Sequence, residues 1–196
     1  RVAKFARYDD VDGDGIAART LPGVSAKGAY FTRGSGHDRL AAYTEDSAAY
    51  QEVVDRIARK LAGAAEALPE PEIRLASGDG DASSADAFAP LAVVTIGGCR
   101  GAVLEAVDRL SEEGIALDFL RVRGFPFSRA VGDFLRAHER VFVVEQNRDA
   151  QLRSLLILET GVSGDLLVPL LDYGGVPLSA RRVVEGVLSQ LAPVPA

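Results

Sequence analysis

The stretch LAVVTIGGCRGAVLEAVDRLSEEGIALDFLRV, residues 91–122, decides the fold. It opens with an apolar run, 91–96, that is typical of a strand buried on both faces. Two glycines then lead into a segment with apolar residues at helical spacing, which stops at Gly114, a residue suited to a left-handed helix end. A second strand is expected at 115–122. The stretch therefore predicts a strand, a helix and a parallel strand.

The same alternation continues to the end of the chain. Helices are predicted at 128–138, 152–161 and 179–191, and strands at 141–144 and 166–171. Pro169 lies inside the last strand and lacks a backbone donor, which indicates an edge strand. We therefore predict that residues 91–196 form an α/β fold, a three-layer α/β/α domain with a mainly parallel sheet and right-handed crossovers.

The part before this domain has a different character. Residues 1–45 are rich in Gly, Asp, Arg and aromatic residues without sustained periodicity, so a loop-rich segment is expected. Apolar residues at three- and four-residue steps predict one long amphipathic helix over 46–68. The Pro-, Gly-, Ser- and Asp-rich stretch 69–90 is interpreted as a surface linker.

Composition excludes several classes of function. A net charge of −6 and a pI near 5.0 disfavour nucleic acid or an anionic membrane as a partner. The apolar runs are too short for a membrane span. A single cysteine, Cys99, cannot by itself form a disulfide, a metal site or an iron–sulfur site, and it favours a reducing, cytoplasmic location. Methionine is absent, including from position 1, so we expect the chain to be a segment of a longer protein.

Two stretches resemble ligand-binding motifs only in part. The turn 97–101, GGCRG, lacks the spacing of a dinucleotide or phosphate loop, so a plain strand-to-helix turn is expected, with Cys99 as a small packed side chain. The stretch 10–15, DVDGDG, copies the start of a calcium loop. Its twelfth position is Leu21 instead of glutamate, so a surface turn without a metal is expected.

Two groups of residues are candidates for contact with a substrate or another subunit. Glu145, Asn147 and Arg148 follow the most hydrophobic strand and suit hydrogen bonding to a neighbouring domain or ligand, although helix capping by Asn147 or Asp149 explains them equally well. The second group lies near the N-terminus and comprises Arg7, Arg19, Arg33 and His37. It could offer positive charge to a carboxylate, and an inter-subunit contact is the favoured use. No catalytic residue can be assigned.

Four stretches resemble the alpha subunit of 2-oxoacid:ferredoxin oxidoreductases, in particular the 2-oxoglutarate type. They are RYDDVDGDGIAARTLPG (7–23) with AYFTRGSGHD (29–38), YQEVVDRIARKL (50–61) and VFVVEQNRDAQLRSLL (141–156). Where many members of that family have a glycine before the helix-starting glutamine, this chain has Ala150.

The resemblance implies an enzyme that decarboxylates a 2-oxoacid on thiamine diphosphate and passes electrons through iron–sulfur clusters to ferredoxin while forming an acyl-coenzyme A. Residues 1–68 would be the tail of the pyrimidine-side domain, and residues 91–196 a transketolase C-terminal-like domain that packs against its neighbours. Thiamine diphosphate, magnesium and the clusters would be held by the full complex, including its beta subunit. This chain alone would be inactive and would bind none of them.

Two alternatives stay open from the sequence. One is the C-terminal part of a 2-oxoacid dehydrogenase or transketolase, which the sequence of residues 7–38 disfavours. The other is a stand-alone α/β interaction or nucleotide-binding module, which the missing phosphate-loop spacing disfavours.

Overall fold

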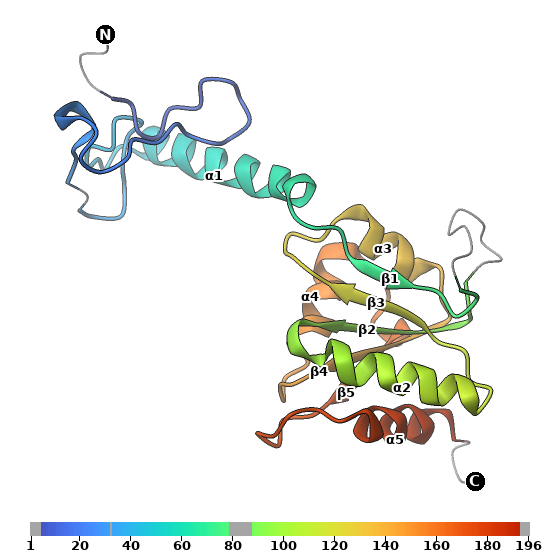
Figure 1. Cartoon of the computed structure of the whole chain (residues 1–196). Helices are drawn as coiled ribbons and strands as arrows, with labels where there is room; N and C mark the ends of the chain where they lie inside the picture. The colour runs from blue at the N-terminus through green and yellow to red at the C-terminus, as the bar shows by residue number, and fades with distance from the viewer. Residues whose placement is uncertain (1–4, 32, 79–87, 193–196) are drawn as a thin grey trace. The chain divides into compact units, whose positions relative to one another are not determined.

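The computed structural model of the chain describes residues 5–31, 33–78 and 88–192 (Figure 1). Contacts within the chain divide it into two compact units, Arg1–Ala67 and Leu68–Ala196.

The first unit consists of ordered loops and one long helix. Its elements are η1 (Ala26–Gly28) and α1 (Ser47–Ala67). The Asp46 carboxylate accepts a hydrogen bond from Ala49 N at 2.8 Å and so caps the start of α1. Gly15 lies against the backbone of this helix, because a Cβ atom there would come within 2.4 Å of Lys60 N. The loop-rich segment and the long helix of the prediction are therefore confirmed.

The apolar face of α1 is not buried by these loops. Tyr50, Val54, Ile57 and Leu61 are 44–51% exposed. The residue of α1 that the unit does bury is Arg56. The loops thus pack on the polar side of the helix, which the apolar periodicity did not predict.

The second unit contains a five-stranded sheet in the order β1-β3-β2-β4-β5. Its strands are β1 (Glu72–Arg74), β2 (Leu91–Ile96), β3 (Asp118–Val122), β4 (Arg140–Glu145) and β5 (Leu167–Leu171). Its helices are η3 (Gly97–Cys99), α2 (Arg100–Glu112), α3 (Arg129–Arg136), α4 (Gln151–Thr160), η4 (Gly164–Leu166) and α5 (Ala180–Leu191). Strands β3, β2, β4 and β5 are parallel. The predicted mainly parallel sheet is confirmed.

Helices cover both faces of the sheet, which gives three layers (Figure 1). Successive residues of a strand point to opposite faces, so Val94 packs with α3 and α4 while Val93 packs with α2 and α5. Both apolar clusters are continuous across the sheet, and this burial is the main driving force for the fold.

The structure adds one strand to the predicted set. Residues 72–74, expected within a linker, form β1, which pairs antiparallel with β3 and places Ile73 opposite Leu120. Residues 79–87 of that predicted linker lie outside the described part. Strand β3 begins at Asp118 instead of residue 115. Pro169 lies on β5, at the edge of the sheet, as predicted.

Within the described residues, no helix combines the length and the apolar character needed to cross a bilayer.

Candidate functional site

The turn after β4 holds a buried carboxylate that organises the next helix. Glu145 is 2% exposed, and its side chain accepts from Leu152 N at 2.7 Å and from Arg153 N at 3.1 Å. These donors belong to the first turn of α4, where backbone N–H groups lack helical partners and favour an anion. The carboxylate predicted to contact a substrate or subunit is thus used inside the domain, as a helix cap.

Its neighbours divide between internal and external roles. Asn147 donates to Glu145 at 2.5 Å and accepts from the backbone N–H groups of Asp149 and Gln151, so the capping alternative holds for Asn147. Arg148 has a side chain that is 74% exposed, and among the described residues it pairs only with the adjacent Asp149, which is also exposed. Of the three predicted contact residues in this turn, Arg148 remains open to a partner.

In the first unit, Arg7 holds two loop segments together. Its Nη2 donates to Thr20 Oγ1 and to the carbonyl of Gly28, both at 2.7 Å. The guanidinium carbon lies 3.5 Å from the centre of the Tyr30 ring, which is a close cation–π contact. Arg7 therefore has a structural role in addition to any contact with a ligand.

The other predicted residues of this unit do not all converge. His37 Nε2 donates a hydrogen bond to the carbonyl of Arg33 at 3.1 Å, and its ring meets the Tyr8 ring edge-on, with 6.0 Å between the ring centres. The Arg33 guanidinium lies 5.9 Å from the Tyr43 ring. Arg19, by contrast, lines a cavity together with Arg7. The structure thus unites Arg7 with Arg19 and leaves Arg33 and His37 in a separate loop contact.

The cavity shared by Arg7 and Arg19 has a volume of about 400 Å³ and carries four cations. Its lining is made of these two arginines and of Arg56, Lys60, Tyr8, Tyr30, Ile16, Ala17 and Ala18. No acidic side chain is among these described lining residues. Because like charges repel, an anion bound between these four cations would stabilise their arrangement.

Arg56 is the unusual member of this lining. It is 8% exposed, and its Nη1 donates to the carbonyl of Gly15 at 2.7 Å. Its Nε is enclosed and has no hydrogen-bond partner in the described part of the chain. A buried guanidinium without a carboxylate is costly, since each buried charge normally requires a pair.

Sequence reasoning missed Arg56 and Lys60 because they lie on a helix interpreted as simply amphipathic. One signal was present. The two residues are four positions apart, so they lie side by side on α1, and like charges at this spacing destabilise a helix. Such a pair points to an anion or to an acidic neighbour.

The acidic stretch near residue 12 forms a turn. Carboxylate oxygens of Asp10, Asp12 and Asp14 lie within 4.8 Å of one another. The Asp10 carboxylate accepts from the backbone N–H groups of Gly13 and Gly15, both at 3.1 Å, and from Arg59 at 2.9 Å. The hydrogen bond from Arg59 lowers the pKa of Asp10 from its ordinary value, and the two backbone donors add to this effect. This carboxylate is therefore occupied by the turn itself.

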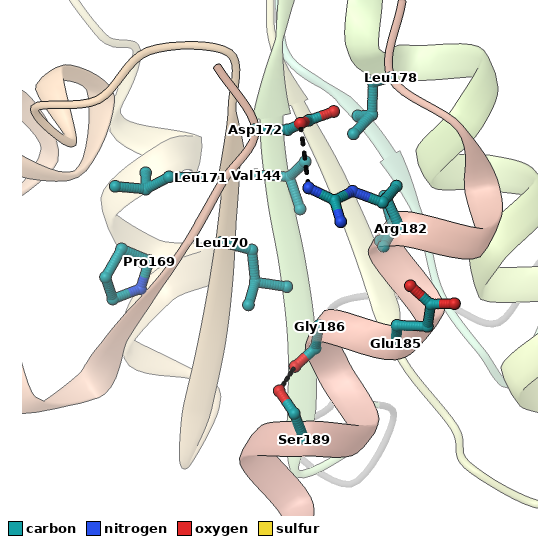
Figure 2. A pocket seen from close by; sticks show the side chains of 11 residues that line it. Val144, Pro169, Leu170, Leu171, Asp172, Leu178, Arg182, Glu185, Gly186 and Ser189 are labelled. Carbon is teal, nitrogen blue, oxygen red and sulfur yellow. Dashed lines mark hydrogen bonds and ion pairs between the residues drawn. The ribbon is translucent and has the colours of Figure 1, made fainter. Parts of the chain in front are cut away.

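The second unit has a cavity of about 320 Å³ between β5 and α5 (Figure 2). Arg182 points toward Asp172, with Nη2 3.6 Å from Oδ1, and the remaining walls include Leu170 and Pro169 (Figure 2). The charges in this cavity are paired, and none of the predicted site residues lines it. Cys99, expected to be packed, is buried, and its thiol lies 3.7 Å from Gln146 Oε1.

The similarity of this chain to known proteins extends over both units. It is 31% identical to the 2-oxoacid:ferredoxin oxidoreductase 2, subunit alpha, of Aeropyrum pernix over 94% of its length. The chain is related to the 2-oxoacid:ferredoxin oxidoreductase alpha subunit. The resemblance predicted from the sequence is therefore confirmed. A second relative, the alpha subunit of a 2-oxoacid:ferredoxin oxidoreductase from Saccharolobus solfataricus, is 28% identical over 79% of the chain.

These relatives are much longer than the chain, which spans 27% and 23% of their lengths. No family model matches the chain. Among solved structures, the chain is similar to a 2-oxoglutarate:ferredoxin oxidoreductase from Magnetococcus marinus with 2-oxoglutarate, coenzyme A and succinyl-CoA bound. The TM-score is 0.77 at 21% identity, over 96% of this chain and 31% of that one. This likeness confirms the predicted fold.

Proposed function

We propose that this chain is a segment of the alpha subunit of a thiamine-diphosphate-dependent 2-oxoacid:ferredoxin oxidoreductase located in the cytoplasm. The observation that carries the proposal is the sequence match over 94% of the chain, since an alignment of that length must include both the loop-rich unit and the α/β unit. A transketolase-type α/β domain alone would account only for the second unit.

The reaction would consume one 2-oxoacid, one coenzyme A and two oxidised ferredoxins. It would release carbon dioxide, one acyl-coenzyme A, two reduced ferredoxins and one proton. We propose 2-oxoglutarate as the 2-oxoacid, which would make the product succinyl-coenzyme A. The support is the fold shared with the Magnetococcus marinus enzyme, whose structure was solved with these compounds.

Within that enzyme, the chain would serve domain packing and subunit contact. Arg148 is exposed at the end of β4, and the apolar face of α1 is half exposed. Both features suit contact with the remaining parts of the alpha subunit and with the beta subunit.

The residues of this chain do not fit the family's redox cofactors. An iron–sulfur cluster needs several thiolate ligands, and the chain has one cysteine, which is buried. The Asp10 carboxylate, in the group of acids that could approach a metal ion, already accepts hydrogen bonds from its own turn. We therefore propose that thiamine diphosphate, magnesium and the clusters are held by other parts of the complex and that the chain alone is inactive.

The test is a ferredoxin-reduction assay on the assembled enzyme, produced from the complete alpha gene and its beta partner. Coenzyme-A-dependent reduction with 2-oxoglutarate is expected, and faster reduction with pyruvate would assign a different 2-oxoacid. Reduction of NAD in place of ferredoxin would favour the dehydrogenase alternative and overturn the proposal. Calorimetry of the 196-residue chain should show no binding of thiamine diphosphate in the micromolar range, and micromolar affinity would contradict its proposed inactivity.

A further inference from the structure

The cationic cavity of the first unit, lined by Arg7, Arg19, Arg56 and Lys60, has the size and charge of a ligand site. Its volume of about 400 Å³ falls in the range of small-molecule pockets. The whole chain has a net charge of −6, yet this cavity gathers four cations without an acidic lining residue. A local excess of positive charge on an acidic protein is best explained by an anionic ligand.

The polar atoms of the cavity are only partly used by the protein. Arg56 Nη1 donates to the carbonyl of Gly15, and the enclosed Nε of the same side chain has no hydrogen-bond partner among the described residues. Neither Arg19 nor Lys60 forms an ion pair within the described part of the chain. A guanidinium fork of this kind matches carboxylate and phosphate oxygens in pairs.

A purely structural role explains part of this arrangement but not all of it. Arg56 does tie the loop at Gly15 to α1, and Arg7 ties Thr20 to Gly28. Loop attachment gives no reason for adding Arg19 and Lys60 to the same cavity. On the same helix, Arg59 lies outside the cavity and forms an ion pair with Asp10 at 2.9 Å. A neighbouring cation with a structural role thus has an acidic partner, whereas the cations of the cavity have none among its described lining residues.

We propose that this cavity binds a small ligand with at least two negative charges, held by the guanidinium groups of Arg7 and Arg56 and by the charges of Arg19 and Lys60. The rings of Tyr8 and Tyr30 supply apolar walls for the body of the ligand. Dicarboxylates and phosphates share this chemistry. The choice of particular compounds rests on the proposed function, which offers a dicarboxylic 2-oxoacid and the phosphates of coenzyme A.

The test is an NMR titration of the 196-residue chain at constant ionic strength, followed through the arginine Nε–H signals. Separate titrations use 2-oxoglutarate, pyrophosphate and adenosine 3′,5′-bisphosphate, with acetate as a singly charged comparison. A dianion should saturate one site with a Kd below about 1 mM and shift the Arg56 Nε–H signal. Tighter binding of the phosphates assigns the site to the coenzyme, and tighter binding of 2-oxoglutarate assigns it to the substrate.

Matched variants distinguish binding in the cavity from a general effect of net charge on affinity. Lys60→Gln and Arg19→Gln should each raise the Kd about tenfold, because each removes a charged partner of the ligand. Arg59→Gln makes the same charge change one residue from Lys60 and should alter the Kd less than about twofold. All three side chains are exposed, so the fold should persist, which circular dichroism checks.

Absence of a saturable shift up to about 10 mM dianion, or an equal loss of affinity in Arg59→Gln and Lys60→Gln, overturns the site. The titration involves no turnover. Failure of the site is therefore distinct from failure of the proposed oxidoreductase activity, which the ferredoxin assay decides.

Discussion

His138 Nε2 lies 3.0 Å from Asp118 Oδ2, and both side chains are completely enclosed. The Asp118 carboxylate also accepts from Ala76 N at 2.7 Å and from Ala89 N at 2.9 Å. The second ring nitrogen of His138 lies 2.7 Å from the carbonyl of Phe134. One buried carboxylate thus joins the segment after β1 and the segment before β2 to β3 and to the end of α3.

Replacing His138 should strongly destabilise the second unit. His138→Leu keeps much of the volume but leaves a buried carboxylate without one of its hydrogen-bond partners, so the free energy of unfolding should fall by about 3 kcal/mol. Urea denaturation followed by circular dichroism measures this loss. The double variant His138→Leu/Asp118→Asn should lose less than the sum of the single variants, and strict additivity would show that the two groups are not coupled.

The buried cap of α4 gives a second prediction. Glu145→Gln preserves the shape of the side chain but removes the negative charge that accepts from Leu152 N and Arg153 N, so unfolding free energy should fall by about 1–2 kcal/mol. Asp149→Asn removes a charge four residues away at an exposed position and should change stability by less than about 0.5 kcal/mol. Equal effects in urea denaturation would argue against the capping role.

The pH dependence of stability should report on Glu72. Arg100 Nε lies 2.9 Å and 2.8 Å from its two carboxylate oxygens, and this hydrogen bonding lowers the pKa of Glu72 from its ordinary value of 4.5, with added attraction from Arg100, Arg121 and Arg123. A carboxyl whose pKa is lower in the folded state stabilises the fold above its unfolded pKa. That contribution is lost as pH falls through the folded pKa.

The difference in unfolding free energy between the parent chain and Glu72→Gln should therefore be largest near neutral pH and decrease below about pH 4.5. Urea denaturation across this range measures it. In an Arg100→Gln background the pH-dependent difference should be smaller, because the principal cause of the lowered pKa is gone. A difference that stays constant with pH in both backgrounds would refute this assignment.

Ala150 offers a stabilising substitution. It adopts a left-handed conformation, φ 49° and ψ 49°, directly before α4, where a β-carbon is unfavourable. Ala150→Gly should raise the unfolding free energy by about 1 kcal/mol, seen as a higher Tm. Ala137→Gly, at a helix end with φ −76°, should instead lower it by about 0.5–1 kcal/mol. A lower Tm for Ala150→Gly would mean that the backbone there is not strained.

Sequence patterns predicted the helices and strands that are determined by the types of nearby residues. The strand 91–96 has the predicted bounds because its apolar run is flanked directly by Pro90 and Gly97. The helix ending at Gly161 was also predicted, since a glycine suits the left-handed residue that follows a helix. Strand β1 was missed because three residues carry little periodicity, and their strand conformation comes from pairing with β3.

The sequence alone therefore determined the α/β alternation, the edge position of Pro169 and the relation to the oxidoreductase alpha subunit, because each depends on the order and type of nearby residues. Tertiary structure decided the uses of the polar side chains. It turned Glu145 into a helix cap and brought Arg56 and Lys60 to Arg7 and Arg19 in one cavity. The physical reason is that hydrogen bonds and charge interactions act over a few ångströms in space, between residues that are far apart in the chain.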